Sequence, residues 1–186
     1  MKHSWKIVTM GLLIAMDIVL TRHLSIQTPI VRLSFGFIAV ALMAMLYGPI
    51  FAGVGAAVAD LIGVTLFPPP VGSFFPGFTL TSFLVGVIYG LFLYLPNKER
   101  TELNSPPYRP VKFWRICVAA VLSVGVSFVL NTLWLSIILD RGFIAMLPGR
   151  IAGSLIMLPI QTATIRFITG ERFRLVFREI FLNNRP

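Results

Sequence analysis

Runs of apolar residues follow one another along this 186-residue chain, with mostly short polar connections between them. A run of about 20 such residues is long enough to cross the hydrocarbon core of a bilayer as an α-helix. Inside a bilayer the backbone groups must bond to one another, so these runs fold as helices. The pattern predicts an all-α, polytopic membrane protein whose residues 1–186 form a single membrane domain.

Six transmembrane helices are expected, at about residues 7–22, 33–47, 50–67, 78–95, 113–139 and 147–168. No small-residue cleavage site follows the first run, which indicates a retained span rather than a signal peptide. A long polar connection over residues 97–112 separates the first four helices from the last two. Arginines alternate with phenylalanines in the tail, residues 171–186, as at a basic amphipathic segment beside a membrane.

Composition excludes a soluble globular domain, because the chain is 56% hydrophobic and 12% charged, with a mean hydropathy of +0.86. The net charge of +9 could suggest nucleic acid as a partner. However, the basic residues flank apolar segments instead of forming one basic patch. We therefore expect the lipid bilayer, and no nucleic acid, as the surroundings of this chain.

The distribution of Lys and Arg predicts the orientation. With six spans, both termini lie on one side of the membrane, and twelve basic residues lie on that side: Lys2, Lys6, Lys98, Arg100, Arg109, Lys112, Arg115, Arg166, Arg172, Arg174, Arg178 and Arg185. The other side holds four: Arg22, Arg32, Arg141 and Arg150. Cytoplasmic loops carry the excess of basic residues, so both termini are expected in the cytoplasm.

An acidic residue at membrane depth, Asp60, distinguishes the third expected helix. Asp60 shares a helix face with small residues, Gly53, Ala56 and Ala57, which predicts that its carboxylate points toward neighbouring helices and not into lipid. A loop of prolines, glycines and aromatics follows from Pro68 to Gly77. The orientation predicts that this loop lies outside.

The unusual residues converge on the outer half of the predicted bundle. The expected ligand-binding residues are Arg32, Phe35, Phe37, Asp60, Phe74, Phe75, Pro76, Gly77, Phe78, Thr79, Asn131, Trp134, Arg150 and Ser154. Arginines at the rim suit an anion, and flat aromatic walls suit a planar ring. An acceptor pair such as Asp60 and Asn131 suits a heterocycle with amino and ring N–H donors. A pterin with a carboxylate tail has all three properties.

Structural interpretations of the same residues remain open. Arg32 and Arg150 could be interfacial anchors near helix starts, and Trp134 could belong to an interfacial aromatic belt. Asp60 could be a structural carboxylate bonded to a backbone group or to Arg32. The small-residue and serine stripes of the fourth and fifth helices are more often packing faces than ligand walls.

Catalysis finds little support in the sequence. The nucleotide-binding GxxxxGK[ST] loop and the HExxH and GxSxG motifs are absent, and His3 and His23 have no partner cysteines for a metal site. Neither a catalytic residue, a metal nor a cofactor is expected. If the protein moves a solute against a gradient, a partner must hydrolyse ATP.

Five blocks of sequence resemble one known family. They read RLSFGFIAVALMAMLYGPI at 32–50, ADLIG at 59–63, FPGFTLTSFLVGVIYGLF at 75–92, LNTLW at 130–134, and LPGRI through LPIQ at 147–161. The chain is similar to the substrate-binding S components of energy-coupling factor (ECF) vitamin transporters, and within them to the folate-specific members.

The resemblance implies a six-helix protein of the bacterial cell membrane that captures folate from outside. It implies association with a transmembrane coupling protein and two ABC-type ATPases, docked on a small-residue face of the first helix that Gly11 and Ala15 match. It also implies that the whole subunit tips over to release folate inward. Other vitamins, riboflavin or pantothenate, remain alternatives, as do a membrane-embedded enzyme and an assembly subunit.

Overall fold

The computed structural model describes residues 2–27, 32–68, 74–94, 111–140 and 143–170. Within these ranges the chain forms six helices and one short antiparallel strand pair. The elements are α1 (Lys2–Arg22), β1 (Ile26–Gln27), β2 (Arg32–Leu33), α2 (Phe37–Tyr47), α3 (Pro49–Leu66), α4 (Pro76–Leu93), α5 (Phe113–Leu139) and α6 (Phe143–Ile168). The predicted all-helical fold class is confirmed.

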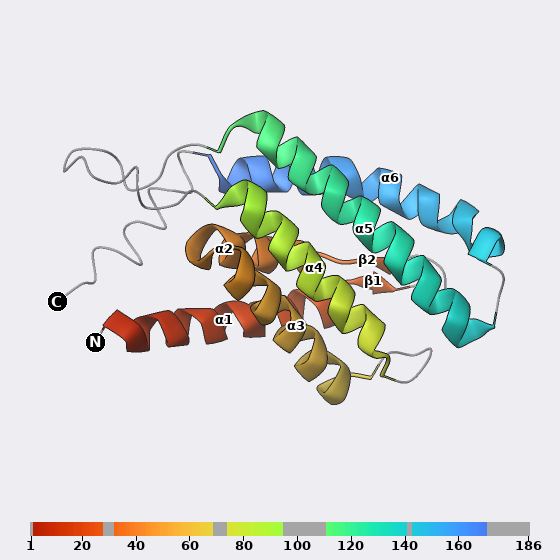
Figure 1. The fold of residues 1–186 in the computed structure, drawn as a ribbon, viewed down its shortest axis with the longest axis horizontal. Helices are drawn as coiled ribbons and strands as arrows, with labels where there is room; N and C mark the ends of the chain where they lie inside the picture. Colours follow the sequence, from red (N-terminus) through yellow and green to blue (C-terminus); the bar gives the residue numbers. More distant parts are fainter. Residues whose placement is uncertain (1, 28–31, 69–73, 95–110, 141–142, 171–186) are drawn as a thin grey trace.

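Helix α4 runs through the middle of the molecule (Figure 1). It packs against α3 on one side and α5 on the other, while α1 contacts α2 and α3 and α6 contacts α5. The chain therefore builds one group of helices, α1 to α3, and a second, α5 and α6, with α4 between them.

The turn between α2 and α3 forms at Gly48 and Pro49, as the sequence predicted. Gly48 has φ +87°, a left-handed conformation that favours glycine. Its N–H donates to the Ala44 carbonyl oxygen at 3.0 Å, and Pro49 occupies the first turn of α3, where a missing N–H leaves no bond unmade.

Glycines bring α3 and α4 into close contact. A Cβ atom on Gly86 would lie 2.5 Å from the Ala52 carbonyl oxygen, and one on Gly90 would lie 2.1 Å from Pro49 Cα. A Cβ on Gly53 would meet the Phe83 carbonyl oxygen at 3.0 Å. The small-residue faces of these two helices are therefore packing faces, which was the structural interpretation of the α4 stripe.

A short hairpin joins α1 to α2. Ile26 pairs with Leu33 and Gln27 with Arg32, and β2 also contacts α6. Because Arg32 and Leu33 form β2, helix α2 begins at Phe37 instead of near residue 33. The hairpin thus bridges the first group of helices to the last helix.

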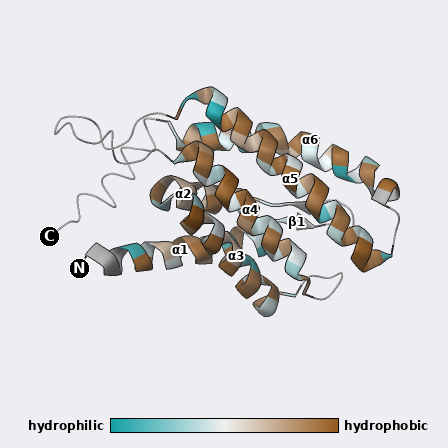
Figure 2. Ribbon diagram, in the orientation of Figure 1, coloured by the Kyte–Doolittle hydropathy of each residue, from teal (hydrophilic) through white to brown (hydrophobic). Residues whose placement is uncertain are grey.

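Many large apolar side chains are exposed on the outside. In Figure 2 the hydrophobic colour covers much of the helical ribbon. Four helical segments are long and apolar enough to cross a membrane: Pro49–Leu66, Pro76–Leu93, Phe113–Leu139 and Leu147–Ile168. Helix α2 is apolar but shorter. Three predicted polar segments fall wholly or mostly outside the described residues: 69–73 of the aromatic loop, 97–110 of the long connection, and the 171–186 tail.

Candidate ligand-binding site

An aromatic cluster forms where α4 begins. The Phe75 ring lies just before the helix, with its centroid 5.5 Å from Trp134 on α5 and 6.2 Å from Phe78. The indole N–H of Trp134 donates to the buried Thr81 Oγ1 at 3.1 Å. A Cβ on Gly77 would lie only 2.5 Å from the indole carbon Cδ2, so glycine is required for this approach.

A guanidinium lies close to this cluster along α5. Arg150 of α6 donates from Nη1 to the backbone carbonyl oxygen of Asn131 at 3.0 Å, and Asn131 lies one turn before Trp134. The Arg150 side chain is half-buried. Because a guanidinium has five N–H donors, one backbone contact orients it and leaves others for an anion.

Asp60 connects three helices. Its Oδ1 lies 3.5 Å from Arg22 Nη2 at the end of α1, and its Oδ2 accepts a 2.9 Å hydrogen bond from Thr79 Oγ1 on α4. The side chains of Arg22 and Asp60 are 5% and 11% exposed. This is a buried ion pair, in which each charge compensates the other.

Glycines make room for the polar end of α1. A Cβ on Gly63 would lie 2.9 Å from Arg22 Nε, so the guanidinium lies directly over the α3 backbone. Within the last two turns of α1, Thr21 Oγ1 donates to Asp17 Oδ1 at 3.0 Å. A Cβ on Gly36 would clash with both of these side chains. The inward face of α1 is thus polar and closely packed.

The carboxylate and the aromatic cluster lie on different sides of α4. Thr79 and Thr81 are two residues apart, which places them about 200° apart around a helix. Thr79 bonds Asp60 of α3, whereas Thr81 bonds Trp134 of α5. The first two turns of α4 therefore connect two clusters.

A second polar group lies farther along the α4–α5–α6 side. The Tyr89 hydroxyl of α4 donates to Gln161 Oε1 of α6 at 3.0 Å, and Ser123 Oγ of α5 donates to the same hydroxyl at 3.0 Å. Tyr89 is completely buried and Ser123 nearly so. Three helices therefore share one buried hydrogen-bond network.

Comparison with known proteins identifies the family. Residues 5–170 match the family model of the ECF transporter, substrate-specific component. The chain belongs to this family. It is a transporter component and not an enzyme, and it is embedded in the membrane.

Three relatives of this S component carry one name. The chain is 39% identical to the folate transporter FolT of Clostridium novyi (strain NT), over 89% of the chain and 88% of the relative. It is 31% identical to the folate transporter FolT of Leuconostoc mesenteroides subsp. mesenteroides, over 89% and 84%. Its fold matches the crystal structure of FolT bound with folic acid, with a TM-score of 0.76, 34% identity, and 90% of this chain and 94% of that chain covered.

The structure of this S component brings together several of the predicted site residues. The aromatic cluster contains Phe75, Gly77, Phe78 and Trp134; Asp60 meets Thr79; and Arg150 meets Asn131. The half-buried Ser154 lies one turn after Arg150 on α6. Their role in binding a ligand stays a prediction.

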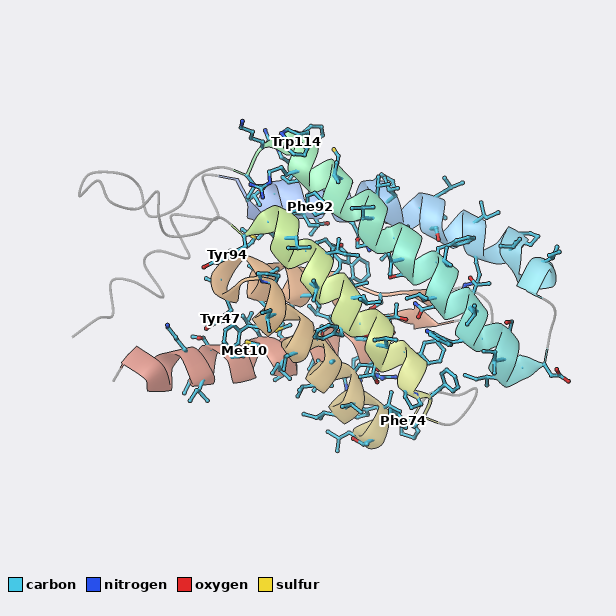
Figure 3. All side chains as sticks on the ribbon, viewed as in Figure 1. Met10, Tyr47, Phe74, Phe92, Tyr94 and Trp114 are labelled. Carbon is cyan, nitrogen blue, oxygen red and sulfur yellow. The ribbon has the colours of Figure 1, made fainter. Side chains whose placement is uncertain are left out.

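Other predicted residues have different surroundings. Phe37 belongs to the hydrophobic core and Phe35 packs against that core, with ring centroids 6.4 Å apart. Phe74 is exposed, at the end of the molecule where α3 stops and α4 starts (Figure 3), and Pro76 is exposed as well. The side chain of Arg32 lies outside the described part of the structure.

Asp60 and Asn131 make separate contacts within the protein, and their expected role as an acceptor pair for a ligand stays a prediction. Asp60 accepts from Thr79 and pairs with Arg22, while Asn131 contributes its backbone carbonyl to Arg150. The ion pair of Asp60 is with Arg22, whereas the structural interpretation named Arg32. Trp134 points into the bundle toward Thr81, so its contacts are those of an inward residue and not of an aromatic belt.

Sequence reasoning missed Arg22 and Thr81 as members of these clusters. By its sequence Arg22 stands at the end of the first predicted helix, where it counts only toward the predicted topology. One signal could have identified it, because Arg22 is among the four basic residues on the side where the positive-inside rule expects few. For Thr81 the helical spacing to Gly77 was the available signal, since the two lie on one face of α4.

Proposed function

We propose that this S component binds folate and takes it up together with an ECF coupling module. The observation that carries the proposal is the match over nine-tenths of the chain to FolT bound with folic acid, at 34% identity. The aromatic cluster and the half-buried Arg150 supply the chemistry that such a ligand needs. The binding step requires no catalytic residue.

Each part of folate has a counterpart among these residues. Folate carries flat aromatic rings, and offset or edge-on packing against Phe75 and Trp134 suits such a ring. The glutamate tail is anionic, and Arg150, already oriented by Asn131, suits a carboxylate through paired N–H donors. We propose that the ring enters first and that the tail stays near Arg150.

We propose the ligand-contacting set that the sequence predicted, centred on the aromatic cluster with Arg150, Asn131 and Ser154. Within that set Asp60 has two roles to test. Its carboxylate could accept from the pterin N–H donors, as predicted, since each oxygen has a second lone pair. Its bond to Thr79 also supports a positioning role for the first turn of α4.

We propose six spans in a single membrane domain, with both termini in the cytoplasm and the folate site facing outside. The twelve-to-four distribution of Lys and Arg supports this orientation. Under it, Phe74 and the start of α4 lie at the outer surface, and the α5 residue Trp114 lies at the opposite, cytoplasmic end (Figure 3).

We propose that the coupling protein docks on α1, with two ABC-type ATPases completing the transporter. Gly11 and Ala15 are both exposed, and a Cβ on Gly11 would meet no atom within 4 Å. Small residues on an open helix face allow another helix to approach closely. Asp17 projects from nearly the opposite face of α1, where it is buried in the bundle.

A binding experiment tests the ligand. The S component is purified in mild detergent, and its tryptophan fluorescence is titrated with folate, riboflavin and pantothenate in parallel. We expect quenching at micromolar folate or below, and no displacement of folate by the other two vitamins. Tight binding of riboflavin or pantothenate alone would reassign the substrate.

A transport experiment tests the function. The S component and its coupling module are reconstituted in liposomes, and uptake of labelled folate is measured with and without ATP. Uptake that needs ATP and the whole module supports the proposal. Partner association without any small-molecule affinity would instead indicate an assembly subunit.

A further inference from the structure

The inward face of α6 carries a partly accessible glutamine among buried residues. Met157 and Ile165 lie four residues to either side of Gln161, on the same helix face, and both are buried. Gln161 itself is only partly buried. A polar side chain on the inward face of a membrane helix is costly to leave without partners, and such residues mark ligand or ion sites.

The hydrogen-bond network orients the carboxamide of Gln161. Tyr89 donates to Oε1 at 3.0 Å, and Ser123 Oγ approaches the same oxygen at 3.5 Å. Both hydroxyls therefore meet the oxygen end of the side chain. The other end of the carboxamide is the nitrogen Nε2, whose two N–H groups are the donors that Gln161 can offer to a ligand.

The position of Gln161 fits the inner end of an elongated ligand. Gln161 lies eleven residues after Arg150, about 16 Å along a helix, and Ser123 lies eight residues from Asn131, about 12 Å. Both steps run in the same direction through the bundle, because α5 and α6 are antiparallel (Figure 1). If the glutamate of folate lies at Arg150, the pterin at the other end of the molecule lies toward Gln161.

We propose that Gln161, held by Tyr89 and Ser123, donates from Nε2 to the 4-oxo group of the pterin and so determines specificity. This inference rests on the proposed folate binding with the glutamate at Arg150. It places the pterin at Gln161 and the benzoate ring beside the aromatic cluster, and it leaves Asp60 its positioning role. The 4-oxo group is a hydrogen-bond acceptor, and the donor opposite it is fixed in place before the ligand arrives. A ring with a donor at that position would leave two donors facing each other, which binding sites reject strongly.

Aminopterin provides the test, because it is folic acid with an amino group in place of the 4-oxo group. The wild-type S component should bind folic acid at least about 10-fold more tightly than aminopterin. Gln161→Glu replaces the amide donor by a carboxylate acceptor, and should lower or reverse that ratio. Gln161→Leu removes the donor without adding charge, and should bring the ratio close to one.

Two further variants separate recognition from packing. Tyr89→Phe keeps the ring but releases Gln161 Oε1, so it should lower the ratio less than Gln161→Leu does. Thr162→Val is the matched control, since Thr162 is the next residue and its hydroxyl donates to the Leu158 carbonyl within α6. This control should leave the ratio unchanged.

The possible failures are distinguishable. If the wild-type protein binds no folic acid, the proposed function is wrong. If the wild-type protein binds it, and Gln161→Leu keeps both the affinity and the wild-type ratio, the network is purely structural and this inference is wrong. Monodispersity in detergent is checked for each variant, and Gln161→Leu decides the outcome if the glutamate variant does not fold.

Discussion

The indole N–H of Trp134 on α5 donates to the hydroxyl of Thr81 on α4, 3.1 Å away, while the indole ring packs over Gly77. This contact fixes the plane of the indole beside Phe75. In the proposed folate complex, a ligand ring beside Phe75 would contact an aromatic wall that is already oriented. The cost of ordering the wall is therefore met in folding rather than in binding.

Trp134 should report folate binding by its fluorescence. The other tryptophans are Trp5 and Trp114, and Trp114 is exposed on the first turn of α5, far from the aromatic cluster (Figure 3). We expect Trp134→Phe to remove most of the folate-induced quenching, whereas Trp114→Phe keeps it. Titrations of both variants measure this, and full quenching in Trp134→Phe would exclude the cluster as the site.

Arg150→Ala should weaken folate binding more than pteroate binding, because pteroate lacks the glutamate. Loss of a charge-assisted pair is expected to cost about 1.5–3 kcal/mol, or roughly 10- to 100-fold in Kd. Calorimetric titration of both ligands gives the two ratios. Equal losses for folate and pteroate would assign Arg150 to holding α6 against α5.

Breaking the Arg22–Asp60 pair should destabilise the protein. A buried ion pair that loses one partner leaves an uncompensated charge, at a cost of about 3–5 kcal/mol. We expect Arg22→Met and Asp60→Asn to lower the thermal unfolding midpoint in detergent, and the double variant to recover part of the loss. Arg166→Met, which removes a guanidinium stacked over Phe113, is the control.

Single variants that unfold at the wild-type temperature would show that the Arg22–Asp60 pair contributes little. Folate titration of the same variants separates the two roles of Asp60. Loss of affinity in Asp60→Asn but not in Thr79→Val favours direct contact with the ring. Parallel losses in both favour positioning of α4.

Gly90→Ala should disrupt the packing of α3 on α4, since its Cβ would lie 2.1 Å from Pro49 Cα and backbone atoms must move. Overpacking of this kind costs about 1–3 kcal/mol. Gly125→Ala is the matched control, because a Cβ there would meet nothing within 4 Å. Unfolding midpoints of the two variants measure the difference, and an equal effect would contradict the close approach of these helices.

Gly11→Leu should impair uptake without changing folate affinity. A Cβ at this position meets no atom within 4 Å, so the added side chain would extend from the open face of α1. Uptake with the reconstituted coupling module and the Kd of the isolated subunit are measured together. Gly125→Leu, on an equally open position of α5, should leave both unchanged; if Gly11→Leu does the same, α1 is not the docking helix.

Local sequence was sufficient to predict which faces of the helices look inward. The stripe of Ser123, Asn131 and Trp134 on α5 and the stripe of Arg150 and Gln161 on α6 all contribute contacts between helices in the structure. The turn at Gly48 was equally predictable. Helical periodicity and backbone sterics act within a few residues, so the chain itself contains this information.

The partners across these faces could not be predicted. Tyr89 and Gln161 are 72 positions apart, and Asp60 forms its ion pair with Arg22, at the end of a helix that lies two helices earlier in the chain. Nor could periodicity show that the first turns of α4 serve two clusters, because the partners of Thr79 and Thr81 lie on α3 and α5.

The sequence by itself determined that this protein is a bundle of membrane helices, where the helices lie along the chain, and which side chains point inward. Only the tertiary structure decided that Asp60 of α3 contacts α1 and α4, and that the Trp134 indole bonds to Thr81. The physical reason is that a helix determines its own faces by its pitch, whereas the helix that covers each face is chosen by close packing of the whole bundle.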